Sequence, residues 1–229
     1  MLISKLILAA STSATSAVWW RLFNIYLVLS IVFSAFFIAW ILYLVISTRE
    51  KPGREVINHI KPGIIPSSTR GRPRNVAFLV LFLVVVFFGL YIYSLPATYY
   101  IRQAPSNSSN TLTIDVYAAQ WTWTFRYPNG YNVTGSANVK NYTAEFPVNT
   151  TIIFRVTSLD VMHEFSIPAF KVKVDAFPGV WNTIWTNVYQ QGTYTAFCTE
   201  LCGLGHADMY VHMQFVSVST YNAWIASQK

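Results

Sequence analysis

The chain has 229 residues, of which 53% are hydrophobic and only 11% are charged, a composition too apolar for an ordinary soluble domain. Its formal charge of +7 does not indicate nucleic-acid binding, because the excess Lys and Arg residues flank two apolar runs. Residues 101–229, by contrast, hold seven basic and seven acidic side chains and are formally neutral.

Two long uncharged runs in the first half of the chain predict transmembrane helices. Residues 22–48 and 76–95 are nearly all apolar, and Pro96 ends the second run. At about 1.5 Å of rise per residue, each run can cross the roughly 30 Å hydrocarbon core as a helix. A chain of this length has no core thick enough to bury two such helices. We therefore predict transmembrane helices over residues 22–48 and 76–96.

The basic residues predict on which side of the membrane each segment lies. Residues 49–75 hold seven Lys and Arg residues, whereas only Arg102 closely follows the second run. The positive-inside rule then places this loop in the cytoplasm and both termini outside, as in a multi-pass protein of the cell membrane. Residues 1–21 are interpreted as an outer tail rather than a cleaved signal peptide, because the apolar stretch at residues 6–10 is short for one.

Residues 101–229 have the pattern of an exported β-domain. Thr, Tyr, Asn and Val dominate, and short alternating runs are separated by turn residues such as Pro128, Asn129 and Gly130. This pattern predicts an all-β sandwich. The alternating runs span residues 111–127, 151–157, 183–188 and 210–218. Four sequons, which fit an exposed and glycosylated surface, begin at Asn107, Asn132, Asn141 and Asn149.

The two cysteines of the chain belong to a compact set of soft metal ligands. The set comprises Cys198, Cys202, His206 and Met209. Two thiols, an imidazole and a thioether select copper over magnesium or calcium. A disulfide is an alternative for two cysteines in an exported domain, but a disulfide would not explain the presence of His206, Met209 and the more distant His163. Zinc is a second alternative, although a Met is not expected at a structural zinc site.

The spacing of these residues resembles that in subunit II of cytochrome c oxidase, a family whose exported domain carries the dinuclear copper centre CuA. The motifs are Cys198-x3-Cys202-x3-His206-x2-Met209, Ser158-Leu-Asp160-Val-Met-His163 and Asp175-Ala-Phe-Pro178-Gly179. The two helices, the basic loop and the β-domain extend the resemblance over almost the whole chain. It implies two transmembrane helices followed by a cupredoxin-like Greek-key sandwich.

The resemblance also implies a set of copper ligands. It implies that Cys198 and Cys202 are the bridging thiolates. The terminal imidazoles would be His163 and His206, and the weak axial ligands would be Met209 and the backbone carbonyl of Glu200. No ligand position of the family is missing. The carboxylate of Glu200 is expected to bind magnesium at the border with subunit I, the alternative being a carboxylate hydrogen-bonded to backbone.

Trp121 and Trp123 are two residues apart, so we expect both on the same face of one strand. Such a pair by itself indicates sandwich core. In the family, a Trp matching Trp121 lies near the surface over the copper and is where electrons enter. The resemblance therefore implies that Trp121 takes up electrons, while Trp123 belongs to the core.

The function implied by the resemblance is electron transfer from a soluble donor, cytochrome c or a blue-copper protein, to subunit I of an oxidase that reduces oxygen. Partners would be subunit I, the other oxidase subunits and the membrane, with no nucleic acid. A copper-containing nitric oxide reductase and a membrane-anchored copper carrier are the alternatives. Nitrous oxide reductase carries the same copper motif together with a large additional domain, which we do not expect here.

Three features depart from the family pattern. The Glu common before the second helix is missing, the nearest being Glu55, and Glu164 stands where Ser usually follows the first His ligand. The domain also has few carboxylates outside the copper motifs. We therefore expect a weakly charged docking surface for the donor.

Overall fold

The structure is a computed structural model of the chain that describes residues 11–49, 73–105, 110–139 and 144–228. The expected outer tail up to residue 10, the basic loop over residues 50–72 and the sequons at Asn107 and Asn141 lie outside the described residues. The chain divides into two compact units, one of residues 25–96 and one of residues 1–24 together with 97–229.

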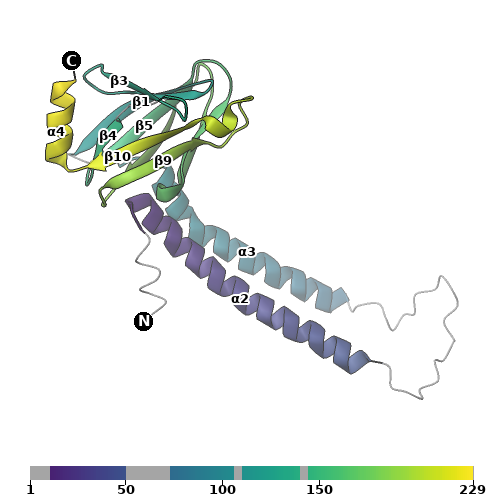
Figure 1. The fold of residues 1–229 in the computed structure, drawn as a ribbon. Coiled ribbons are helices and arrows are strands. Elements are labelled where there is room, and N and C mark those ends of the chain that lie inside the picture. Colours follow the sequence, from purple (N-terminus) through teal and green to yellow (C-terminus); the bar gives the residue numbers. More distant parts are fainter. Residues whose placement is uncertain (1–10, 50–72, 106–109, 140–143, 229) are drawn as a thin grey trace. The chain divides into compact units, whose positions relative to one another are not determined.

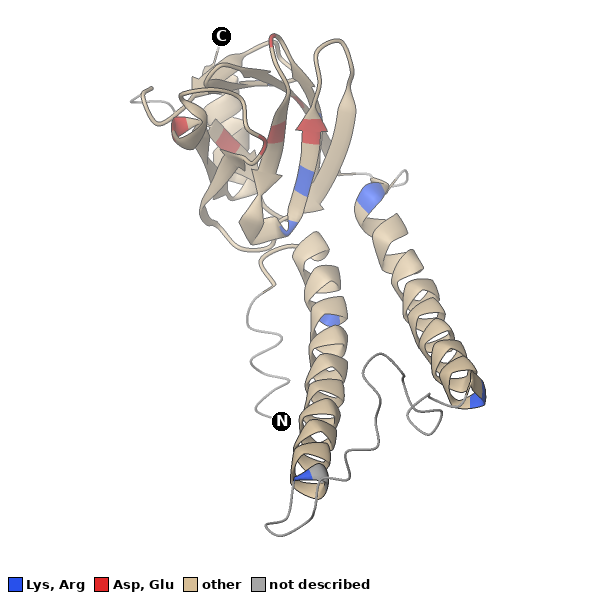
Figure 2. Cartoon of the chain, turned by 90° about the vertical axis from the view of Figure 1, so that its right-hand side faces the viewer, with Lys and Arg blue, Asp and Glu red and all other residues tan. Residues whose placement is uncertain are grey.

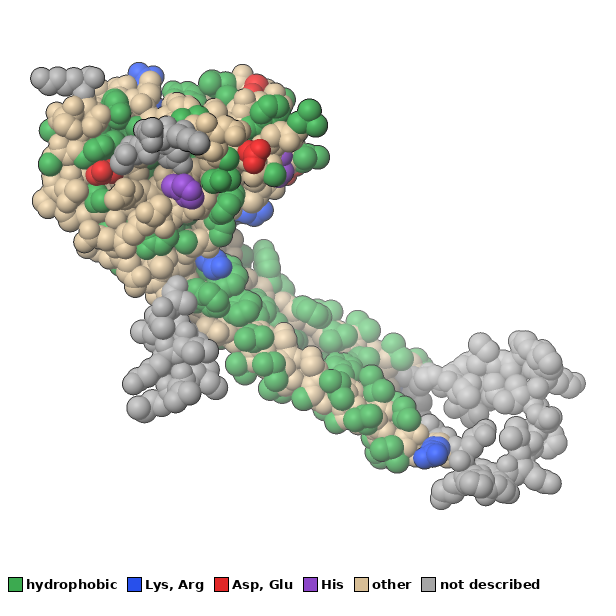
Figure 3. Space-filling view, in the orientation of Figure 1, with side chains coloured by type: hydrophobic (Ala, Val, Ile, Leu, Met, Phe, Trp, Pro, Cys, Tyr) green, Lys and Arg blue, Asp and Glu red, His purple; other side chains and the backbone are tan. Residues whose placement is uncertain are grey.

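Two long helices, α2 (Ala14–Thr48) and α3 (Pro73–Arg102), dominate the first part of the chain (Figure 1). Both are long and apolar enough to cross a membrane, and the most apolar stretch of each is unburied. Their basic residues are Arg21, Arg74 and Arg102 (Figure 2), and apolar side chains occupy much of their visible surface (Figure 3). Exposed apolar surface of this length suits a lipid environment.

Both helices extend past the apolar runs that mark them in the sequence. Helix α2 begins at Ala14, and α3 continues through Pro96 to Arg102. Proline lacks an N–H donor, but a membrane helix with neighbouring partners tolerates it. The hydroxyl of Tyr26 donates a hydrogen bond of 3.1 Å to the carbonyl of Leu90, which links the two helices.

Two five-stranded sheets form the sandwich predicted for the second half of the chain. The first has the order β3-β2-β1-β5-β8, with β1 (Thr111–Ala119), β2 (Thr122–Arg126), β3 (Asn132–Gly135), β5 (Thr151–Ser158) and β8 (Asn182–Asn187). The second has the order β4-β10-β9-β6-β7, with β4 (Ala144–Pro147), β6 (His163–Ile167), β7 (Val172–Ala176), β9 (Gly192–Cys198) and β10 (Tyr210–Val216). The pairs β1/β5 and β4/β10 are parallel and the other neighbours antiparallel. The prediction of a β-sandwich is confirmed.

The run at residues 111–127 is two strands and not one, which corrects the expectation for the two tryptophans. Strand β1 pairs with β2 as a hairpin in which Ala119 faces Thr122, so the chain reverses at Gln120 and Trp121. Buried side chains alternate within each strand, at Ile114, Val116 and Ala118 and then at Trp123 and Phe125, so a shift from even to odd positions marks the reversal. The prediction that Trp121 and Trp123 share one face of one strand is therefore wrong.

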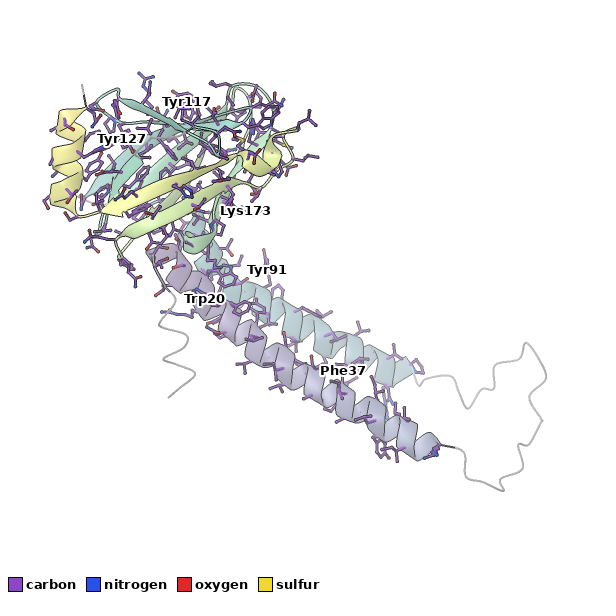
Figure 4. All side chains as sticks on the ribbon, in the orientation of Figure 1. Trp20, Phe37, Tyr91, Tyr117, Tyr127 and Lys173 are labelled. Atoms are coloured by element: carbon purple, nitrogen blue, oxygen red, sulfur yellow. The ribbon has the colours of Figure 1, made fainter. Side chains whose placement is uncertain are left out.

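A helix, α4 (Val218–Ser227), follows the last strand and was not expected in an all-β domain. Its N-terminus is capped by Ser217, whose hydroxyl accepts a hydrogen bond of 3.1 Å from the Thr220 N–H. The Trp224 ring packs 5.1 Å from that of Tyr127, which lies near α4 in Figure 4. Helix α4 thus covers one edge of the core.

Aromatic side chains fill the space between the two sheets and anchor the strand that begins with His163. The Phe165 ring lies 5.0 Å from the Trp123 ring and 5.6 Å from the Phe154 ring, and all three side chains are fully buried. Strand β6 pairs with β9 so that Phe165 faces Cys198. Core packing therefore fixes β6, which begins with His163, beside β9, which ends with Cys198.

Candidate metal centre

The six expected metal-binding residues come together at one end of the second sheet. His163 is the first residue of β6, and Cys198 is the last residue of β9. The chain then forms a loop, which we call the cysteine loop (residues 199–209), that includes the short helix η3 (His206–Asp208). The Cys198 N–H donates a hydrogen bond of 2.9 Å to the carbonyl of Met209, which closes the loop at its base.

The two cysteine sulfurs are the centre of the cluster, 3.7 Å apart. The Cys198 Sγ lies 3.8 Å from His163 Nδ1 and 3.2 Å from the Glu200 carbonyl oxygen. The Cys202 Sγ lies 3.5 Å from His206 Nδ1 and 3.7 Å from Met209 Sδ. Each sulfur therefore has one imidazole nitrogen, the other sulfur and one weaker donor beside it. Such a pairwise arrangement can hold two metal ions that share the sulfurs.

The structure does not join the two cysteines in a disulfide. Both cysteines are free, and their sulfurs are 3.7 Å apart, whereas a disulfide bond is about 2.05 Å long. Both side chains are buried among the other donors. A single structural zinc ion would leave part of this six-donor set unused, because such sites take four ligands.

The metal-free thiols differ in acidity. Burial raises the pKa of Cys198, but hydrogen bonds outweigh it, the one with His163 first, and lower that pKa to about 7. Burial and the adjacent Cys198 raise the pKa of Cys202 to about 12. The first proton of the pair is therefore lost from Cys198 more readily than the second is lost from Cys202. A bound metal would have to displace that second proton.

Asp160 orients the imidazole of His163. Its Oδ1 lies 2.8 Å from His163 Nε2, so Nε2 carries the hydrogen and Nδ1 is left to face Cys198. Burial opposes ionisation of Asp160, but hydrogen bonds from His163 and from the N–H groups of Gln120 and Val161 hold its pKa below the ordinary value. A carboxylate behind a histidine is a common support for a metal ligand.

Trp121 lies against the cysteine loop, and Trp123 lies in the core. The Trp121 Nε1–H reaches the Cys202 carbonyl at 3.4 Å, and the neighbouring Gln120 amide donates to the same oxygen at 2.7 Å. A β-carbon at Gly205 would come within 2.7 Å of the Trp121 ring, so glycine permits this approach. Trp123 is fully buried, as expected for a core residue.

Two residues near the centre were not identified as site residues from the sequence. Gln120 bonds the cysteine loop although 82 positions separate it from Cys202. Glu164 contacts Thr199 and Lys173 through its side chain, although the sequence shows only that it replaces the usual Ser. Both contacts join residues far apart in the chain, so no motif in the sequence predicts them. The one signal in the sequence is that Gln120 directly precedes Trp121 and Glu164 directly follows His163.

Comparisons with known proteins agree with the motifs. Residues 137–216 match the family described as "Cytochrome C oxidase subunit II, periplasmic domain". The chain is 31% identical to "Heme-copper oxidase subunit 2" of Aeropyrum pernix over 202 residues, covering 85% of this chain and 83% of that protein. It is 32% identical to the "Probable cytochrome c oxidase subunit 2" of Rickettsia felis, and the match spans about half of that protein, 54% of its length.

A solved structure also resembles the β-domain. The periplasmic domain of subunit II of cytochrome oxidase from Bradyrhizobium japonicum is 32% identical, with a TM-score of 0.50. The match covers 55% of this chain and 96% of that structure. The sandwich is thus cupredoxin-like, as the sequence motifs imply.

Proposed function

Because the chain belongs to the cytochrome c oxidase subunit II family, we propose that it is the copper-bearing subunit of a terminal respiratory oxidase. Its sandwich domain holds a dinuclear CuA centre that accepts electrons from a soluble donor. The electrons pass to the haem centres of subunit I, where oxygen is reduced to water. The observation that carries this proposal is the pair of thiols, each beside an imidazole nitrogen and one weaker donor.

The donor set suits two copper ions. Two thiolates 3.7 Å apart can bridge the metals, with His163 and His206 as terminal ligands beside different sulfurs. The Met209 thioether and the Glu200 carbonyl would supply the weaker donors. When bound, such a centre shares one electron between two metals, so little surrounding polarisation has to change on electron transfer.

The proposed location and partners follow from this assignment. The two apolar helices anchor the chain in the cell membrane beside subunit I and the other oxidase subunits, with the copper domain on the outer side. The Glu200 side chain is half-buried, and its carbonyl already faces Cys198. Its carboxylate is therefore left to bind a magnesium ion at the border with subunit I.

Trp121 is the proposed point of electron uptake. Its ring packs on the loop that contains Cys202, and the residue is partly exposed. On the same loop, Leu201 is 78% exposed and Leu204 is fully exposed. Exposed apolar side chains beside a partly exposed tryptophan favour a docking face held by apolar contact.

Two of the carboxylates near the centre are paired within the domain, whereas Asp208 on the cysteine loop is exposed. Asp160 bonds His163, and Glu164 pairs with Lys173. The domain as a whole is formally neutral. The donor we propose is thus a soluble cytochrome c with a weakly charged face, or a small blue-copper protein.

Isolation of the native complex tests the proposal. We expect two coppers per chain, a mixed-valence signal with hyperfine structure from two equivalent nuclei, co-purified haem subunits and turnover of oxygen. One copper per chain with a single-nucleus pattern would contradict the dinuclear centre. Turnover of nitric oxide instead of oxygen would indicate a reductase, and labile colourless copper(I) would indicate a copper carrier.

A further inference from the structure

Glu164 is a buried carboxylate directly after one of the proposed copper ligands. Its neighbours on β6, His163 and Phe165, turn their side chains into the core, so Glu164 points to the opposite face of the sheet. It is nevertheless only 7% exposed. Burying a carboxylate is costly unless charged and hydrogen-bonding partners compensate it. The partners of Glu164 therefore matter to the structure around it.

The contacts of Glu164 join three segments of the second sheet. The Lys173 Nζ, on β7, lies 2.9 Å from Glu164 Oε1 and donates a hydrogen bond of 3.2 Å to Oε2 (Lys173 is labelled in Figure 4). The Thr199 hydroxyl, at the start of the cysteine loop, donates a hydrogen bond to Glu164 Oε2. The Thr199 N–H also donates to the backbone carbonyl of Glu164 at 3.1 Å. Glu164 thus accepts hydrogen bonds from Thr199 with both its backbone carbonyl and its side-chain carboxylate.

We infer that Glu164 is a positioning residue for the copper centre, acting through Thr199. Thr199 lies between Cys198 and Glu200, whose sulfur and carbonyl oxygen are 3.2 Å apart. Fixing Thr199 fixes the direction in which the chain leaves β9, and so the place of both donors. This inference rests on the proposed copper function, because those two donors belong to the proposed centre.

The ion pair between Glu164 and Lys173 has a different role from the hydrogen bond between Glu164 and Thr199. The Lys173 side chain is 66% exposed, and ion pairs with so exposed a partner contribute little by themselves. The cation compensates the charge of Glu164, whereas the Thr199 hydrogen bond determines the geometry. The two contacts can therefore be removed independently, which separates positioning from charge.

The test uses the full-length chain with three substitutions and one control. Thr199→Val removes the hydroxyl but keeps the side-chain shape, Thr199→Ser keeps the hydroxyl, and Lys173→Met removes the cation. Glu145→Gln alters a partly buried carboxylate on the edge strand β4 and serves as the control. Hydrogen exchange across residues 198–202 is measured in the metal-free chain. The optical spectrum and copper affinity are measured after loading.

For Thr199→Val we expect exchange about tenfold faster, because a hydrogen bond to a charged group is lost. Copper affinity should fall about tenfold, with an altered spectrum, as when other supports of metal ligands are removed. Thr199→Ser and Glu145→Gln should match the parent in all three measurements. Lys173→Met should keep the parental spectrum, because the Thr199 hydrogen bond remains.

Two outcomes would overturn the inference. Exchange in Thr199→Val equal to that in Thr199→Ser would show that the hydroxyl does not hold the loop. An altered spectrum in Lys173→Met as large as that in Thr199→Val would show that charge compensation is the role of Glu164. Hydrogen exchange needs no metal, so it decides the inference even if the parent chain binds no copper and the proposed function fails.

Discussion

The Trp121 ring and Gly205 are in such close contact that no side chain fits between them. A β-carbon built at Gly205 would come within 2.7 Å of ring atoms Cγ and Cε3. Real carbon contacts require about 3.5 Å, so the ring and the cysteine loop pack at the closest possible distance. The residue proposed to take up electrons thus lies directly on the loop that carries four of the six proposed ligands.

Gly205→Ala should therefore displace Trp121 from the loop and slow electron uptake. The added methyl group forces the ring or the loop to move, and overpacking of this kind costs about 1–3 kcal/mol of unfolding free energy. Rapid-mixing measurement of copper reduction checks the rate, and chemical unfolding checks the stability. Gly89→Ala is the matched control, because a β-carbon there meets nothing within 4 Å. Equal reduction rates in both variants would show that the contact with Gly205 has no part in electron uptake.

Removing different donors of the cluster should have different consequences. Met209→Leu should keep copper bound and raise the reduction potential by roughly 60 mV, because loss of a donor disfavours the oxidised state. Cys198→Ser and Cys202→Ser should each abolish the dinuclear signal, because a bridging thiolate is lost. Metal analysis and potentiometry check both expectations. Loss of all copper in Met209→Leu, together with two coppers in Cys198→Ser, would reverse the assigned roles.

Asp160→Asn should weaken copper binding about tenfold, because the charged group that orients His163 is lost. The Asp160 carboxylate accepts hydrogen bonds from His163 and from the Gln120 and Val161 N–H groups. An asparagine amide would place its own N–H groups against one of these donors. Competition with a copper chelator measures the affinity. Asp208→Asn, which alters an exposed carboxylate of the cysteine loop, is the control, and equal affinities in the two variants would contradict a supporting role for Asp160.

Electron uptake from the donor should depend weakly on salt. The domain is formally neutral, and steering by opposite charges is the effect that falls steeply with ionic strength. Second-order rates of copper reduction by cytochrome c and by blue-copper proteins, measured from low to high salt, check this. Trp121→Ala should slow reduction by every donor. A fall with salt of about tenfold or more, with an unchanged rate in Trp121→Ala, would show that charges elsewhere guide docking.

Local patterns in the sequence were sufficient for the helices, the sandwich class and four side chains of the proposed metal centre. Uncharged runs of membrane length mark α2 and α3, and alternation marks most strands. Cys198, Cys202, His206 and Met209 lie within twelve consecutive residues, so their spacing alone shows that they can meet. These features depend on neighbours in the chain, which is why a single sequence reveals them.

The relationships across the fold were decided by the tertiary structure. His163 meets Cys198 across 35 positions because β6 and β9 pair in one register. Trp121 leaves the strand pattern because β1 and β2 form a tight hairpin, and it then meets Gly205. The hold of Glu164 on Thr199 likewise depends on the pairing of strands that are distant in the chain. Pairing register and core packing set such contacts, and no local spacing of residue types encodes them.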